Sequence, residues 1–166
     1  MKQVAREVVW EGKLFDVVVE RWGAKVRELA EHQGSVTIVP VDREGRIVLT
    51  RQFRESARGK LLELPAGMLD RGEIPLAAAQ RELAEETGLH GGTWRLLRAI
   101  HPSPGFVREP VSVYLAEDLE EGERDPDEGE EIEVVRLTPA QLEAELGELE
   151  DAKTLVGVLL YLRERG

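Results

Sequence analysis

The chain contains no cysteine and no asparagine, and it has no uninterrupted apolar run of membrane-spanning length. The absence of cysteine excludes disulfides, thiolate metal sites and cysteine nucleophiles. Because the N-terminus also lacks the apolar stretch of a signal peptide, we expect a cytoplasmic protein. The lack of asparagine, combined with abundant charged residues, suggests a protein from a thermophile, although a GC-rich genome produces the same bias.

Basic residues are also scarce relative to acidic ones. The 22 lysines and arginines are outnumbered by 33 aspartates and glutamates, which gives a net charge of −11. This balance argues against general affinity for nucleic acid or for anionic membranes, because both depend on basic side chains. An anionic small molecule would therefore need local positive charge, from a metal ion or from arginine. The length of 166 residues, of which 42% are hydrophobic, predicts one globular domain spanning residues 1–166.

Apolar, β-branched segments predict most of the strands. They cover residues 14–22, 36–41, 46–53, 93–100, 111–116 and 132–137. The turn at residues 42–45 predicts that its two flanking strands pair as a hairpin. Residues 25–32 fit either a strand or a helix, and periodicity alone does not decide between them.

Three helices are predicted. The clearest runs from Pro75 to Thr87, with proline in its first turn and Gly88 as a left-handed cap. Thr138 and Gln141 form a capping box that opens a C-terminal helix, and a further helix passes through residues 155–162. This order of strands and helices indicates helices packed on both faces of a mixed sheet.

The helix predicted over residues 75–87 carries more negative charge than is favourable for the stability of a helix. Glu82 lies four residues before Glu86 and three before Glu85, so the carboxylates share one face and repel one another. Two of them also lie in the last turn, at the negative end of the helix dipole, and Arg81 can offset one through an i,i+4 pair with Glu85 but cannot offset all three. A hard divalent cation would make this arrangement favourable, whereas the alternative from these residues alone is a solvent-facing acidic stripe.

The helix is part of a longer pattern. Gly67 is followed at fixed spacings by Glu73, Arg81-Glu82-Leu83, Glu85-Glu86 and Gly88-Leu89. This pattern resembles the Nudix box, the metal-binding motif of the Nudix hydrolases, and matches it at every specified position. The resemblance implies a Nudix-type α/β/α sandwich with a mixed β-sheet. In that fold the box forms a loop–helix–loop site for Mg²⁺, or for Mn²⁺ or another divalent cation.

The resemblance also implies a role for each residue of the box. Metal ligation is expected chiefly from Glu82 and Glu86, with Glu85 as a further ligand or as the catalytic base, and with the carbonyl of Ala66. Four positions are expected to brace the loop and the helix, partly through an Arg–carboxylate pair: Gly67, Glu73, Arg81 and Gly88.

A second resemblance lies outside the box. Pro104 stands sixteen residues after Gly88, and this spacing resembles the ADP-ribose pyrophosphatase branch of the family, as do residues 52–54 and 63–67. The branch implies a homodimer, to which residues 1–33 contribute as an N-terminal strand region. It also implies five residues that contact the substrate: Arg27, Arg54, Ser103, Pro104 and Glu109. Of these, Arg27 is expected to contact adenosine across the subunit interface. Residues 106–108 depart from the more Gly- and Ser-rich loop of the branch.

The acidic stretch at residues 117–133 supports two interpretations. Its charge alone predicts a solvated loop. A loose alignment of residues 127–132 with a family loop implies instead that Glu128 is the catalytic base and Glu130 a metal ligand. Glu85 is the other candidate base, and both interpretations of the stretch remain open at this point.

These features predict hydrolysis of the diphosphate bond of ADP-ribose to AMP and ribose 5-phosphate by a metal-activated water. Alternatives are hydrolysis of another nucleoside diphosphate derivative (a nucleotide sugar, a dinucleotide or an oxidised nucleotide), a non-catalytic module that senses ADP-ribose, and a purely structural domain. No nucleic acid or membrane partner is expected. His101 and Trp22 are further candidates for substrate contact, against the simpler interpretations of an exposed loop histidine and a core or interface aromatic residue.

Overall fold

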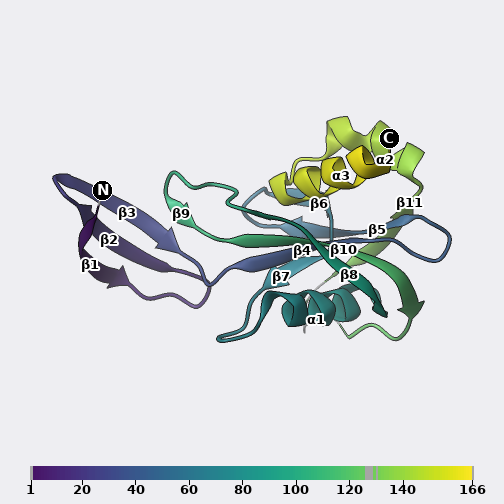
Figure 1. Cartoon of the computed structure of the whole chain (residues 1–166), viewed down its shortest axis with the longest axis horizontal. Coiled ribbons are helices and arrows are strands. Elements are labelled where there is room, and N and C mark those ends of the chain that lie inside the picture. The colour runs from purple at the N-terminus through teal and green to yellow at the C-terminus, as the bar shows by residue number, and fades with distance from the viewer. Residues whose placement is uncertain (1, 126–128, 130, 166) are drawn as a thin grey trace.

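The computed structural model describes residues 2–125, 129 and 131–165 and shows a layered α/β body with a smaller sheet beside it (Figure 1). Its elements in chain order are β1 (Gln3–Trp10), β2 (Asp16–Trp22), β3 (Lys25–Glu31), β4 (Ser35–Pro40), β5 (Ile47–Arg54), β6 (Gly59–Glu63), β7 (Ala66–Met68), α1 (Pro75–Thr87), β8 (Leu89–Ile100), β9 (Val107–Arg108), β10 (Val111–Glu121), β11 (Glu133–Leu137), α2 (Pro139–Glu145), the 3₁₀ turn η1 (Leu146–Glu148) and α3 (Ala152–Arg165).

Helices cover both faces of the central strands, α1 on one side and α2 with α3 on the other (Figure 1). Side chains of β4 alternate between the two faces. Val36 and Ile38 belong to the apolar cluster that contains Leu83 of α1, whereas Val39 belongs to the cluster that contains Val158 of α3. Strands buried on both faces read as continuous apolar runs, as β4 does. The predicted α/β/α class is confirmed.

Within the described residues the strands form three hydrogen-bonded sheets, ordered β7-β4-β10-β8, β11-β5-β6 and β1-β2-β3-β9. The first is mixed, because β4 runs parallel to β10 and antiparallel to β7. The predicted hairpin between the strands around residues 42–45 is wrong. β4 and β5 belong to different sheets and share only the bridge between Val41 and Ile47. Both edges of β4 are already paired, with β7 and β10, so the turn redirects the chain into a second sheet.

The N-terminal sheet stands apart from the layered body (Figure 1). Residues 25–32, for which the sequence left two possibilities, form β3 and the start of the following loop. β9 joins the edge of β3, where Ala30 pairs with Val107 and Glu31 with Arg108. Glu31 also forms ion pairs with Arg6 of β1 and with Arg108, the latter at 2.7 Å. The loop before β10 is thereby attached to the N-terminal sheet.

The predicted helix ends are confirmed by their caps. Gly88 follows α1 in the left-handed conformation, with φ of 78°, and its N–H donates to the carbonyl of Ala84 at 2.9 Å. Thr138 and Gln141 form both hydrogen bonds of a capping box at the start of α2. In the described part of the chain, no helix is both long and apolar enough to span a membrane.

Candidate functional site

Arg81 is the centre of the ion-pair network on the segment from Gly67 to Leu89. Its Nε and Nη2 atoms donate to Glu73 at 3.1 and 3.0 Å, and Nη1 donates to Glu82 at 2.9 Å and to Glu85 at 3.0 Å. Nη2 also donates to the carbonyl of Met68 at 3.1 Å. The hydrogen bonds from Arg81, together with one from a backbone N–H, hold the pKa of Glu73 below its ordinary value. One guanidinium therefore joins the loop to the helix, as the bracing prediction requires.

Gly67 allows the carboxylate of Glu82 to lie directly against the backbone of β7. A Cβ atom at position 67 would overlap that carboxylate group. Because α1 packs this closely on β7, the Glu82 carboxylate lies beside the residue that follows Ala66. The structure thus brings together Ala66, Gly67 and Glu82, which the sequence predicts to share one site.

The last turn of α1 is covered by residues 122–125. Glu86 is 4% exposed, and its carbonyl accepts a hydrogen bond from Arg124 Nε at 2.8 Å. The N–H of Asp125 donates to the carbonyl of Glu85 at 3.2 Å. A Cβ on Gly88 would lie 2.6 Å from the carbonyl oxygen of Gly122, so this contact also requires glycine. The acidic stretch is therefore anchored on the end of α1, while Glu128 and Glu130 lie outside the described residues.

The donors around α1 have the chemistry of a site for a hard cation. They are carboxylates from successive helical turns beside a backbone carbonyl, and Mg²⁺ and Mn²⁺ prefer such oxygen ligands. Over residues 2–125, 129 and 131–165, no group of three or more histidine, aspartate or glutamate side chains is arranged so that it could hold a metal ion. Glu82 and Glu85 instead pair with Arg81, because a guanidinium is the neighbouring positive charge.

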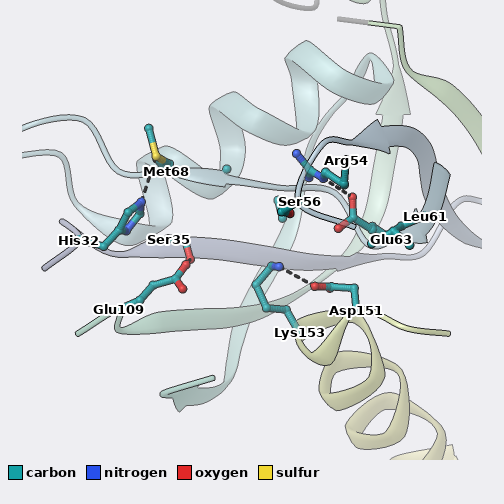
Figure 2. A pocket seen from close by; sticks show the side chains of 12 residues that line it. His32, Ser35, Arg54, Ser56, Leu61, Glu63, Met68, Glu109, Asp151 and Lys153 are labelled. Carbon is teal, nitrogen blue, oxygen red and sulfur yellow. Dashed lines mark hydrogen bonds and ion pairs between the residues drawn. The ribbon is translucent and has the colours of Figure 1, made fainter. Parts of the chain in front are cut away.

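A cavity of about 360 Å³ opens beside β7, between the first two sheets and the start of α3 (Figure 2). Three polar pairs line it. Arg54 Nε donates to Glu63 at 2.7 Å, Ser35 Oγ donates to Glu109 at 2.8 Å, and Lys153 Nζ lies 2.6 Å from Asp151. Its other lining residues are His32, Ser56, Leu61, Ala66, Gly67 and Met68.

The cavity brings together the predicted residues Arg54, Ala66, Gly67 and Glu109. Glu63, only 3% exposed, was not predicted as a site residue, although it begins the segment 63–67 that carries the branch resemblance. Among the members of the other two polar pairs, the sequence also missed Ser35, Asp151 and Lys153, and no local signal identifies them. Burial would raise the pKa of Asp151, but the charge of Lys153 and hydrogen bonds from Lys153 and Thr154 outweigh burial and hold that pKa below its ordinary value.

His32 fixes the position of Met68 at the edge of the cavity. The N–H of Gly34 donates to His32 Nδ1 at 3.1 Å, so Nδ1 is an acceptor and the neutral ring carries its proton on Nε2. His32 Nε2 lies 3.0 Å from the sulfur of Met68 and is the donor of that contact. This contact ties the end of β3 to β7, the strand that carries Gly67.

Other predicted substrate residues lie away from this cavity. Pro104 lines a second cavity of about 440 Å³ between the N-terminal sheet and the loop after β8, together with Trp22 and His101. Ser103 contributes its carbonyl to the turn, where it accepts from Val107 N at 3.0 Å. Arg27 is exposed on β3 and lines neither cavity. The structure of one chain therefore does not bring Arg27, Ser103 and Pro104 to the Arg54 cavity.

Comparisons with known proteins agree with this geometry. The chain matches the family model of the NUDIX domain over residues 31–156. It is 39% identical to an ADP-ribose pyrophosphatase of Bacillus subtilis, an alignment that covers 98% of this chain and 94% of that protein. It is also 39% identical to an ADP-ribose pyrophosphatase of Mycobacterium tuberculosis, over 94% of this chain and 80% of that protein.

The fold has a close counterpart among solved structures. The crystal structure of an ADP compounds hydrolase superposes with a TM-score of 0.80 at 24% identity and covers 99% of this chain and 95% of that one. This likeness confirms the arrangement of layers described above. Because the family model matches most of the chain and the curated relatives align along nearly its full length, the chain belongs to the NUDIX domain family.

Proposed function

We propose that this protein hydrolyses the diphosphate of ADP-ribose to AMP and ribose 5-phosphate with the help of a divalent cation, Mg²⁺. The observation that carries the proposal is the Arg81 network, which joins Glu73, Glu82 and Glu85. The Glu82 carboxylate lies against Gly67, which lines the same cavity as Arg54. The substrate follows from the two relatives, which bear the name ADP-ribose pyrophosphatase and align over nearly all of this chain.

Glu82, Glu86, Glu85 and the carbonyl of Ala66 are the groups that would hold Mg²⁺, with Glu130 as a further candidate outside the described residues. All are oxygen donors of the kind that Mg²⁺ takes. When bound, the cation would neutralise the charge of the diphosphate and lower the pKa of a water molecule. Arg81 keeps the unliganded carboxylates from repelling one another, because it donates hydrogen bonds to two of them.

Arg54 is the proposed contact to the diphosphate. The Nε bond to the buried Glu63 fixes the plane of the guanidinium, so that its Nη groups can donate to a pair of phosphate oxygens. Glu85 or Glu128 accepts a proton from the attacking water. The resulting hydroxide attacks the adenosyl phosphorus, the bond from that phosphorus to the bridging oxygen breaks, and ribose 5-phosphate leaves with that oxygen. Charge that develops on the phosphate oxygens is stabilised by Arg54.

The first test is a product assay with ADP-ribose, GDP-mannose, a diadenosine polyphosphate and 8-oxo-dGTP, each with Mg²⁺ or with EDTA. The proposal expects AMP and ribose 5-phosphate from ADP-ribose at the highest rate, and no product with EDTA. Preference for another of the four compounds would retain the hydrolase and reject the assigned substrate. Binding of ADP-ribose without any product would identify a sensing module instead.

The metal ligands are tested by Glu82→Gln and Glu86→Gln. Each variant is expected to lose at least about a hundredfold in kcat at saturating Mg²⁺, since a neutral amide neither binds the cation well nor balances its charge. Glu143→Gln, at an exposed position on α2, is the matched control. Thermal unfolding of the variants should stay close to that of the wild type. Wild-type turnover in either site variant would reject the metal assignment.

We further propose that the protein is a homodimer assembled through residues 1–33. The support is apolar surface on this region that one chain leaves exposed: Val4, Val8, Val9, Trp10, Leu14, Phe15 and Val26. Exposed apolar side chains that accumulate in one small region of a protein are typical of a surface for protein–protein contact. Light scattering of the wild type should give twice the chain mass. Val9→Asp should shift the protein toward monomer, whereas Leu159→Asp, at a similarly exposed position on α3, should not.

A further inference from the structure

Lys153 lies in the wall of the Arg54 cavity, where few lysines would be expected. It is the second residue of α3, and its side chain is only 23% exposed. A surface lysine normally keeps its ammonium group in water. Here Nζ is bound to Asp151, and both side chains line the same cavity as Arg54, Ala66 and Gly67 (Figure 2).

The position of Lys153 is unfavourable for the helix that carries it. A cation in the first turn faces the positive end of the helix dipole, and an apolar or acidic residue would stabilise that turn better. Asp151 compensates in part, because it precedes the helix and accepts hydrogen bonds from Thr154 N and Thr154 Oγ1, both at 2.8 Å. The helix therefore needs Asp151 as its cap, and Lys153 supports the helix only through its ion pair with that carboxylate.

The start of α3 is tied to the segment that carries the box glycine. Thr154 is fully buried, and its hydroxyl accepts a hydrogen bond from the N–H of Leu64 at 2.8 Å. Leu64 follows Glu63, the partner of Arg54, and lies two residues before Ala66. A buried hydrogen bond thus joins the segment of Lys153 to that of Glu63, the partner of Arg54, and the two cations lie on different walls of one cavity. Among the described residues, Lys153 is paired with the carboxylate of Asp151 and Arg54 with that of Glu63.

We propose that Lys153 binds the sugar phosphate half of the substrate, the half that leaves as ribose 5-phosphate. The inference rests on the proposed function, which places the diphosphate between Arg54 and the box. An ammonium group has three N–H donors, so Lys153 can bind a phosphate oxygen while it remains bound to Asp151. Glu109 lines the same cavity and can accept from sugar hydroxyls. Lys153 is then the residue that selects a phosphorylated sugar on the leaving side.

Direct binding of the two products tests this assignment without the need for turnover. Titration calorimetry with Mg²⁺ measures the affinity of the full-length protein for ribose 5-phosphate and for AMP. Lys153→Met should weaken ribose 5-phosphate binding about tenfold, the size expected for loss of one charge-assisted hydrogen bond, and should leave AMP binding unchanged within about twofold. The KM for ADP-ribose should rise by a similar factor. Lys153→Arg should recover part of the affinity, because it restores the charge.

Lys60→Met is the control, because Lys60 is exposed on β6 and is not among the residues that line the cavity. Lys153→Met should still fold, because the Asp151 carboxylate that loses its ion pair keeps the hydrogen bonds from Thr154 N and Thr154 Oγ1, and because a cation is removed from the start of a helix. Equal weakening for AMP, or unchanged binding of ribose 5-phosphate, would overturn the assignment. Failure of the wild type to hydrolyse ADP-ribose would instead reject the proposed function, and the ribose 5-phosphate titration would still decide the role of Lys153.

Discussion

Replacement of Gly67 by alanine is expected to lower the rate of catalysis strongly while it leaves the stability of the fold nearly unchanged. The added methyl group would overlap the carboxylate of Glu82, and that carboxylate is the end of a flexible side chain. Carbon atoms in ordinary contact lie about 3.5–4.0 Å apart, so the carboxylate must move by at least about 1 Å. The backbone need not move, because Gly67 does not have a positive φ. The methyl group therefore displaces a proposed metal ligand and leaves the strand in place.

The two consequences differ in size. Glu82 can lose its hydrogen bond to Arg81, which costs about 1–2 kcal/mol for a partly exposed charged pair. Replacement of glycine by alanine returns about 0.4–1 kcal/mol, because it restricts the unfolded chain. The net change in stability should stay within about 1 kcal/mol, or roughly 2–4 °C in Tm. A catalytic group misplaced by 1 Å can cost about a hundredfold in rate.

Turnover of ADP-ribose and thermal unfolding, measured on the same preparations, check this prediction. Gly67→Ala should lose about a hundredfold in kcat/KM at nearly unchanged Tm. Gly147→Ala is the control, because no atom lies within 4 Å of its added Cβ and its φ is not positive. Wild-type turnover in Gly67→Ala would refute the role assigned to the Glu82 carboxylate. A large fall in Tm would refute the claim that the side chain alone absorbs the overlap.

Further predictions concern the supports of the site. Thr154→Val leaves the buried N–H of Leu64 without its acceptor, which costs about 2 kcal/mol and should lower Tm by about 4–8 °C. Thr154→Ser keeps the hydrogen bond and should keep the Tm. Equal Tm values for the two variants would contradict this prediction. The pKa of Glu73 is lowered by hydrogen bonds from Arg81 and a backbone N–H, so Glu73 stabilises the fold above its ordinary pKa of 4.5 and loses this contribution as pH falls below it. The Tm difference between the wild type and Glu73→Gln should therefore shrink between pH 5 and pH 3, and a constant difference would contradict the prediction.

Local signals in the sequence were sufficient for the helix that carries the box. Pro75 and Gly88 bound α1 because one lacks an N–H that the first turn does not use and the other adopts a positive φ without strain. The pairing of Arg81 with Glu73 also followed from the motif. Periodicity did not give the bounds of β1, because nearly all of its residues are exposed and it shows no alternation of buried and exposed positions; only the family resemblance implied a strand region over residues 1–33.

The sequence by itself determined the family, the box helix and the layered class, since these depend on motifs and on periodicity along short stretches of chain. Only the tertiary structure decided which residues share a cavity. Ser35 meets Glu109 across 74 positions, and Leu64 meets Thr154 across 90. It also decided that β4 and β5 part at their turn, because β7 and β10 occupy both edges of β4. Contacts over such separations depend on how sheets and helices pack, and that packing cannot be inferred from the residue types of short stretches of chain.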